Sequence, residues 1–338
     1  MSLTSVEKNQ ELMSLALEDR SKSYQDLVSN ANPLLHVLQD KGNWKPYSGV
    51  TIRETLLYAK SGNTQWYNGF DFLANAPAEL FNDAEFRAKM VAVGVSMANE
   101  DILNNDGDAQ LMDIMEAHLA AAENELQDEV DTSLQSNGTR FSGKELSGLQ
   151  LAIPTVVDSG TYGGIDRSAN AIWDTSAFDA NSFMSAYTQV TATSIRPMLN
   201  QIMTNRSRGK NGADLFLMSP EHYAAYDAAT VAIQRVNDVT DMGKLGFQSL
   251  KYFGAGRQAQ IVQAGGIGST MPANTTYGIS TDNMRMRYNP GRNFDRIFKE
   301  AMMPINQDAR VQYIGFMGEL TMNNPLFMWK LFDSNPAA

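Results

Sequence analysis

The sequence predicts an α+β protein made of two folded units and several extended pieces. Apolar residues at helical spacing predict one long helix over residues 108–135. Short apolar stretches between turn residues predict strands in the second half of the chain. With 338 residues the chain has room for about two domains of about 150 residues each.

The composition excludes several classes of protein. Charged residues make up 19% and hydrophobic residues 43%, which argues against a disordered chain. The net charge of −11 argues against binding nucleic acid through overall charge. The excess acid lies in one window, residues 100–139, which holds eleven Asp and Glu and no Lys or Arg, while the rest of the chain balances. Any account of function must therefore explain this acidic segment.

Residues that carry catalytic or metal chemistry are scarce. The absence of cysteine excludes disulfides, zinc-thiolate sites and cysteine nucleophiles, and the three histidines, His36, His118 and His222, lie far apart. No carboxylate pair, Ser-His-Asp set or metal-ligand spacing is recognisable. The longest apolar stretch, 90–98, is about half of what a membrane-spanning helix needs. We therefore expect no enzyme, no cofactor, no metal and no membrane span.

The first 76 residues read as two appendages. Residues 1–45 form an arm whose apolar patch at 34–38 follows a break at Pro33, and we expect this patch to pack on another surface, such as another chain. Residues 48–73 read as a long hairpin with a turn at 61–63 and a returning strand at 64–72, ended by Pro77. Such a ribbon is marginal alone in water, so it also needs an external surface.

The next segment contains the clearest local signals. Alternation predicts a strand over 86–97, and a turn at 104–108 is favoured over a calcium loop because the EF-hand spacing is missing. The helix at 108–135 carries a single narrow apolar stripe, which suits a helix lying across a sheet. The stripe consists of Leu111, Met115, Leu119, Ala122, Leu126, Val130 and Leu134. Residues 139–178 are rich in loops, and the glycines at 160–164 indicate positive backbone φ rather than a phosphate cradle.

The second unit begins at Asp179. We expect a helix over 180–194, ended or kinked by Pro197, then a buried strand at 215–218 and a helix started by Ser219 and Pro220. The glycines at 254–256 precede a strand instead of opening a helix, which argues against a dinucleotide site. Further strands are expected at 260–262, 276–280, 284–288 and 311–316. Extended pieces with apolar faces are typical of a subunit that assembles.

The order of these pieces resembles the major capsid proteins of tailed bacteriophages, with the Hong Kong 97-like fold. The resemblance covers nearly the whole chain and is clearest in three stretches. They are Gly148–Pro154 with Gly160–Arg167 and Trp173, then Phe183–Tyr187 followed by Arg196-Pro197, and finally Pro304–Ala309 with Gly318-Glu319-Leu320 and Asn323-Asn324.

The resemblance implies a domain plan and a function. It assigns residues 1–45 to an N-terminal arm, 46–76 to an extended loop, 77–178 with 300–338 to a peripheral domain with a spine helix, and 179–299 to an axial domain. The implied function is self-assembly into pentamers and hexamers of an icosahedral shell around phage double-stranded DNA. The implied partners are a portal, decoration proteins and packaged double-stranded DNA bound without sequence specificity. Because the chain lacks room for a fused scaffold, the resemblance implies a separate scaffold or none. The implied location is the virion, after assembly in the host cytoplasm.

Two sets of residues follow from the resemblance. The candidate contacts between subunits are Arg53, Lys60, Trp66, Gly163, Gly164, Arg167, Arg206 and Arg208. The candidate acidic inner face, which would repel packaged DNA, is Asp113, Glu116, Glu123, Asp128 and Asp131. A plain solvated helix face is the alternative for these acids, and covalent crosslinking through Lys60 is not expected. An encapsulin-like shell and a two-domain enzyme remain the rival functions.

Overall fold

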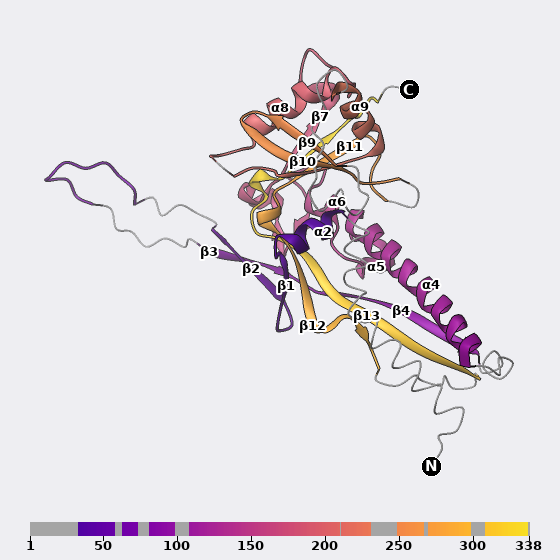
Figure 1. Cartoon of the computed structure of the whole chain (residues 1–338). Coiled ribbons are helices and arrows are strands. Elements are labelled where there is room, and N and C mark those ends of the chain that lie inside the picture. The colour runs from indigo at the N-terminus through magenta and orange to yellow at the C-terminus, as the bar shows by residue number, and fades with distance from the viewer. Residues whose placement is uncertain are drawn as a thin grey trace.

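The computed structural model describes residues 33–57, 63–73, 81–98, 108–209, 211–230, 249–266, 270–298 and 308–336. Figure 1 shows two sheets, one above the other, with a long helix along one side of the lower sheet. A projection leaves the body on the side opposite this helix. This mixture of helices and sheets confirms the α+β class.

The lower sheet has four strands in the order β1 (Trp44–Pro46), β12 (Met284–Arg296), β13 (Ala309–Met322) and β4 (Lys89–Ala98). β13 runs antiparallel to both of its neighbours, and β1 is parallel to β12. Val93 and Val95 of β4 are buried while Ala92, Gly94 and Ser96 are exposed, which confirms the predicted alternation. The strand begins at Lys89 rather than at residue 86, because Phe86 ends the separate strand β3 (Phe81–Phe86).

Helix α4 (Asp108–Gln135) lies against β4 (Figure 1) and has the bounds predicted from its periodicity. Ala122, Leu126, Val130 and Leu134 are all buried, so the described part of the apolar stripe faces the sheet as expected. The chain turns away at Gly138, whose φ of +78° suits glycine. The side chains of Leu111, Met115 and Leu119 lie outside the described part of the helix.

The short helix α2 (Pro33–Asp40) corrects one expectation about the arm. Leu34, Leu35 and Leu38 are completely buried in the core of their own subunit, next to the four-stranded sheet. The apolar patch therefore needs no other chain, because three leucines at helical spacing already find a core within the subunit. Residues 1–32, the rest of the arm, lie outside the described residues.

The upper sheet has six strands in the order β7 (Ser176–Asp179), β14 (Trp329–Phe332), β11 (Thr275–Ile279), β8 (Leu215–Met218), β10 (Arg257–Gln263) and β9 (Ser249–Gly254). Helices α8 (Ile195–Asn205) and α9 (Pro220–Thr230) pack on it through a second core. The strand at 215–218 and the helix start at Pro220 are confirmed. The strands expected at 260–262, 276–280, 284–288 and 311–316 fall within β10, β11, β12 and β13 except at single end residues.

The helix expected over 180–194 is wrong. Only α7 (Ala180–Phe183) is helical there, and the following helix begins at Ile195. Pro197 falls in the first turn of α8, where its missing N–H is harmless, instead of ending a helix. Residues 184–194 form turns, closed in part by the Ser194 hydroxyl donating to the Gln189 carbonyl oxygen at 2.8 Å.

The two sheets also change the expected domain bounds. The boundaries at 179–299 and 300–338 assign β12 to the second unit and β14 to the first, whereas hydrogen bonding places β12 in the four-stranded sheet and β14 in the six-stranded one. These bounds were wrong because the residues of a strand do not indicate which distant strand it will pair with.

The remaining helices and 3₁₀ turns are short and connect these elements. They are α5 (Arg140–Gly143), α6 (Leu149–Ala152), η1 (Arg167–Ala169), η2 (Ala171–Trp173), η3 (Thr281–Asn283) and η4 (Pro325–Phe327).

The expected hairpin is also corrected. Its first strand, β2 (Ile52–Leu57), pairs with β3 (Phe81–Phe86), not with residues 64–72. Residues 63–73 form no strand, and an exposed turn closes them, in which the Asn68 N–H donates to the Asp71 carboxylate at 2.7 Å. Residues 61 and 62 of the turn predicted at 61–63 lie outside the described residues, as do Lys60 and Pro77.

Candidate assembly surfaces

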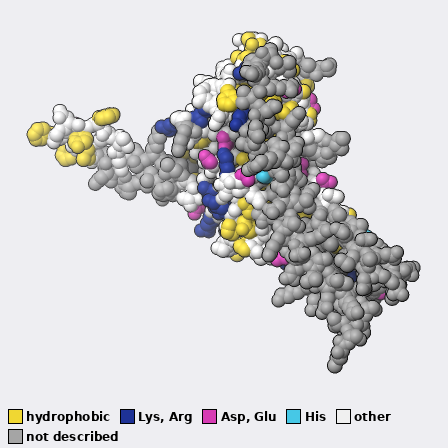
Figure 2. Space-filling model, in the orientation of Figure 1, with side chains coloured by type: hydrophobic (Ala, Val, Ile, Leu, Met, Phe, Trp, Pro, Cys, Tyr) yellow, Lys and Arg dark blue, Asp and Glu magenta, His cyan; other side chains and the backbone are white. Residues whose placement is uncertain are grey.

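The tip of the projection, which we define as residues 63–73, exposes large aromatic side chains. Trp66, Phe70 and Phe72 are as exposed as in an extended peptide, at 104%, 103% and 99% of full accessibility. Figure 2 shows the apolar side chains gathered at the far end of the projection, away from the body. Contiguous exposed apolar groups of this kind mark a surface for binding another protein. The prediction that Trp66 contacts another subunit is consistent with this position and stays a prediction.

The root of the projection is fixed to the four-stranded sheet by a buried charge cluster. Glu54 of β2 is 3% exposed. Its carboxylate accepts hydrogen bonds from Arg285 at 2.8 Å and Arg287 at 2.7 Å, both on β12, and from the Thr321 hydroxyl at 3.2 Å on β13. Two cations and one buried anion form a strong, charge-assisted network. We call this set the Glu54 bracket, and sequence reasoning did not foresee it because Glu54 lies more than 200 residues from its three partners.

The glycine loop at residues 160–164, which follows α6, packs against β3 at the root of the projection. Two short strands, β5 (Thr161–Tyr162) and β6 (Ile165–Asp166), flank Gly163, which has a φ of +59°. A Cβ on Gly163 would lie 2.8 Å from the ring of Phe86, and its carbonyl accepts the Glu85 N–H at 2.9 Å. Arg53 pairs with Glu85 across the ribbon at 2.9 Å. A depression of about 510 Å³ results, lined by Arg53, Asn82, Asp83, Glu85, Gly163 and Gly164. The structure thus brings together three of the predicted contact residues.

Arg167 has a different role from the one expected. Its side chain is 2% exposed and donates to the carbonyl oxygens of Leu151 and Ala152 at 3.1 and 2.8 Å, within its own subunit. The guanidinium also lies over the ring of Tyr162, 5.5 Å from its centre. Arg167 therefore holds the loop-rich segment together and has little surface left for a neighbouring subunit.

The two other predicted arginines lie at the end of α8. Arg206 is half-buried over the ring of Phe178, with 5.8 Å between the guanidinium carbon and the ring centre, and Arg208 is exposed. Neither of them lines the depression formed by Arg53 and the glycine loop. Their contact with another subunit stays a prediction.

The predicted acidic face is described in part. Asp128 is exposed and Asp131 is half-buried, whereas the side chains of Asp113, Glu116 and Glu123 lie outside the described residues. Glu129, on the same helix, pairs with Arg140 at 3.1 Å. The described acids are thus partly exposed and partly paired within the subunit.

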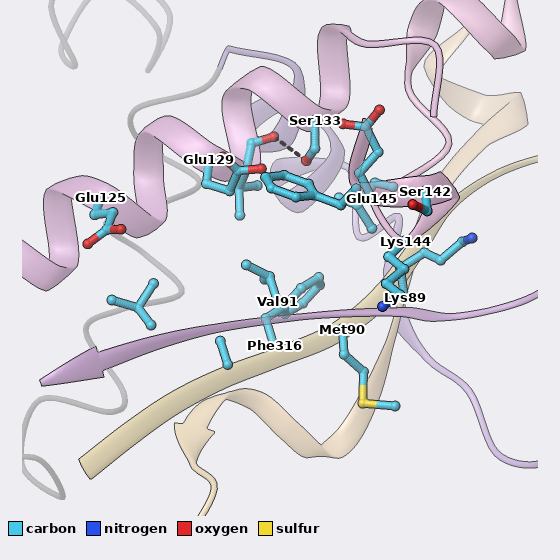
Figure 3. Close-up of a pocket in the computed structure, with 15 residues that line it drawn as sticks. Lys89, Met90, Val91, Glu125, Glu129, Ser133, Ser142, Lys144, Glu145 and Phe316 are labelled. Carbon is cyan, nitrogen blue, oxygen red and sulfur yellow. Dashed lines mark hydrogen bonds between the residues drawn. The ribbon is translucent and has the colours of Figure 1, made fainter. Parts of the chain in front are cut away.

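A groove between the second half of α4 and strand β4 was not predicted (Figure 3). It encloses about 610 Å³ and is lined by apolar side chains of β4, α4 and β13, with charged groups at its mouth. α5 forms one edge, where Phe141 and Ser142 have positive φ values of 49° and 60°. The sequence carries no signal for this groove, because non-glycine residues rarely adopt that conformation.

One buried carboxyl group has a shifted pKa. Glu319 on β13 is 1% exposed, and burial raises its pKa to about 8 although the N–H groups of Ser147 and Leu320 donate to it. Burial also lowers the pKa of His222 to about 4, and its Nδ1 lies 2.8 Å from the Thr276 hydroxyl. Among the described residues no group of three or more His, Asp or Glu is placed to hold a metal ion.

Comparison with known proteins identifies the fold. No protein-family model matches the sequence, and no curated protein matches it significantly. Solved structures do match. The capsid of cyanophage A-1(L) is 15% identical, with 86% of this chain and 90% of that chain covered and a TM-score of 0.64. The capsid of the native GTA particle is 10% identical, with 87% and 89% covered and a TM-score of 0.52.

The capsid of Myoviridae phage XM1 is 11% identical, with 88% of this chain and 91% of that chain covered and a TM-score of 0.50. The chain therefore has the Hong Kong 97-like fold of tailed-bacteriophage major capsid proteins, as the sequence resemblance implied. In the described ranges, no helix combines the length and the apolar character needed to cross a bilayer.

Proposed function

We propose that the chain is a phage major capsid protein that assembles into pentamers and hexamers of an icosahedral shell around double-stranded DNA. The observation that carries the proposal is the projection with its fully exposed aromatic tip, on a fold shared with phage capsids. A protein working as a monomer gains nothing from such a tip, whereas a lattice buries it. Many modest contacts add up through multivalency, so each one can form and dissociate during assembly.

The domain names follow from the proposal. The four-stranded sheet with α4 is the peripheral domain, with α4 as the spine helix, and the six-stranded sheet is the axial domain around the five- and six-fold axes. Residues 1–32 remain assigned to the N-terminal arm and 47–76 to the extended loop, whereas α2 and β1 belong to the body of the subunit, in its core and its four-stranded sheet.

The partners and the location belong to the same proposal. A portal, a separate scaffold and decoration proteins would act with the shell, which assembles in the host cytoplasm and resides in the virion. The protein has no catalytic role in this scheme. The acidic side of α4 faces the shell interior and keeps packaged DNA from adhering, since like charges repel across a solvated surface.

Electron microscopy of the purified protein in negative stain tests the proposal. We expect shells, tubes or capsomers, and we expect far fewer of them for the double variant Trp66→Ala/Phe70→Ala, because the tip loses its aromatic contact area. Val156→Ala is the matched control, since Val156 is also exposed, at 59%, but lies outside the tip and outside both sheets. Monomers under all conditions would contradict the proposal. Nuclease-protected DNA inside the shells separates a phage capsid from an encapsulin-like shell with enzyme cargo.

A further inference from the structure

The sequence contains three Asn-Gly pairs, and one of them lies in the exposed tip of the projection. They are Asn68-Gly69, Asn137-Gly138 and Asn211-Gly212. Asparagine is chemically labile, and most so before glycine, because glycine has no Cβ to shield its nitrogen from the preceding side-chain amide. The fold decides whether that amide and that nitrogen meet, so the three pairs can be ranked by their geometry.

In the tip, the side chain of Asn68 is folded back onto the nitrogen of Gly69. The Gly69 N–H donates to the Asn68 side-chain oxygen at 2.9 Å, so the amide carbon bonded to that oxygen lies close to the nitrogen that can attack it. Both residues are exposed, and apart from its chain neighbours no described residue comes within 4 Å of a Cβ built on Gly69. Because the tip extends away from the body (Figure 1), water reaches this pair freely.

Two further hydrogen bonds hold the turn that contains this pair. The Asn68 N–H donates to the Asp71 carboxylate at 2.7 Å, and the Asp71 N–H donates to the Asn68 carbonyl oxygen at 2.8 Å. A turn that is closed in this way keeps the side-chain amide near the Gly69 nitrogen, which raises the chance that the two react. Asn68 is thus held in a reactive conformation without being buried.

The pair that follows α4 lacks this arrangement. The Gly138 N–H donates to the Ser136 hydroxyl at 3.0 Å. The side-chain oxygen of Asn137 accepts instead from the N–H and the hydroxyl of Thr139, at 3.2 and 2.6 Å. The nitrogen and the side-chain amide are each bound to a different group, so this pair should react slowly.

The third pair is held and covered by two arginines. The N–H and the carbonyl oxygen of Asn211 both form hydrogen bonds with the backbone of Arg208, at 3.0 and 2.9 Å. The guanidinium of Arg257 lies against Gly212, where an added Cβ would come within 2.9 Å of one of its nitrogen atoms. The geometry therefore ranks Asn68 above both other sites.

We propose that Asn68 is a modification site at which the free subunit deamidates without an enzyme. The Gly69 nitrogen attacks the side-chain amide carbon of Asn68 and gives up its proton, the bond from that carbon to the side-chain nitrogen breaks, and ammonia leaves. Water then opens the succinimide ring at either carbonyl group, which leaves aspartate or isoaspartate at position 68. The product carries one more negative charge, close to Asp71.

The consequence for assembly rests on the proposed function, because the tip is the part of the chain that a lattice buries. A carboxylate at position 68 repels the Asp71 carboxylate and must lose its water when the tip is buried. Isoaspartate also adds an atom to the backbone of the turn. Deamidation therefore lowers the ability of free subunits to assemble, and assembly protects Asn68 by excluding water.

Peptide mapping by mass spectrometry tests the site. The purified, unassembled subunit is kept in mildly alkaline buffer, and aspartate and isoaspartate are measured over time at the three positions. We expect conversion at Asn68 to be at least about tenfold faster than at Asn137 and Asn211. Gly69→Ala is the matched variant, because its Cβ has room in the structure and yet shields the nitrogen, so conversion at Asn68 should slow several-fold. Equal rates at the three sites, or no conversion at Asn68, would overturn the inference.

The effect on assembly is measured separately. Asn68→Asp copies the product, and we expect its yield of particles in negative stain to fall several-fold. Asn68→Gln keeps a neutral amide and should assemble as the wild type does, before and after the same incubation. Normal assembly of Asn68→Asp, or equally fast conversion in assembled particles, would contradict the link to assembly and leave the modification site standing. A wild-type protein that never assembles would overturn the proposed function, whereas the peptide map alone decides the site.

Discussion

Glu319 makes the stability of the subunit depend on pH. Burial raises the pKa of this carboxyl group to about 8 from its ordinary 4.5, so the folded chain holds a proton that the unfolded chain releases between these values. The stability it contributes is therefore complete below pH 4.5 and is lost as the pH rises through about 8. Glu319→Gln keeps a neutral group that accepts from the same N–H groups, so this loss should disappear.

Urea unfolding of the unassembled subunit at pH 5.5 and pH 8.5 measures this effect. The difference between wild type and Glu319→Gln should favour the variant more strongly at the higher pH. His222, whose pKa is lowered to about 4, adds stability as the pH rises towards 6.5, but it is common to both proteins and cancels in the comparison. Asp282→Asn, at an exposed carboxyl group, is the control. Parallel pH profiles for wild type and Glu319→Gln would contradict the assignment.

At the scale of the element, the Glu54 bracket is expected to set the direction of the β2–β3 ribbon. Glu54→Ala leaves Arg285 and Arg287 half-buried without their shared anion, and breaking a buried pair typically costs about 3–5 kcal/mol. The amides of β2 and β3 should then exchange hydrogen much faster, while those of β8 and β11 in the other sheet should not.

Glu85→Gln provides the matched control on the same ribbon. Glu85 pairs with Arg53 in an exposed position, and such surface pairs contribute about 0–1 kcal/mol. Hydrogen exchange by mass spectrometry distinguishes the two variants. If Glu54→Ala exchanged no faster than Glu85→Gln, the buried cluster would not be what holds the ribbon.

Local periodicity predicted the elements whose signal lies within their own residues. The stripe Ala122–Leu134 located α4, and Ser219-Pro220 located the start of α9. Pairing of distant strands was beyond such signals, because aromatic residues at 64–72 alternate like a strand yet find no partner, while the true partner of β2 begins at Phe81. The stretch 184–194 was wrongly predicted as helix because its turns depend on hydrogen bonds of Ser194 and Asp333, which the spacing of Tyr187 and Val190 does not indicate.

At the scale of the whole molecule, one candidate surface was predictable from the sequence and another was not. The exposed tip was predictable, since a thin apolar ribbon has no core of its own. The groove was not, because it forms where β4, α4 and the left-handed turn at 141–142 meet. Arg167 was assigned to a contact between subunits by the family resemblance, whereas folding buries its guanidinium against carbonyl oxygens of its own subunit.

The acidic side of α4 is expected to affect how the whole shell interacts with DNA. If the acidic side of α4 lines the shell, adding cations there should make the shell retain DNA. Asn124 and Asp128 are exposed and one helical turn apart, and the double variant Asn124→Lys/Asp128→Lys replaces repulsion by attraction to phosphates. We expect particles assembled with DNA to retain several times more of it at low salt, with the excess lost at high salt.

The control for this prediction must change the net charge by the same amount. Val156→Lys/Asp158→Lys does so at exposed positions off the helix. Particles of each variant are treated with nuclease, and the amount of protected DNA per particle is measured. This amount distinguishes an acidic inner wall from a helix face that is acidic only because it is solvated. Equal retention in both variants would show that total charge governs DNA contact and that α4 is simply a solvated helix face. Excess retention confined to the α4 variant would place this helix on the inner wall, because only that surface meets the enclosed DNA.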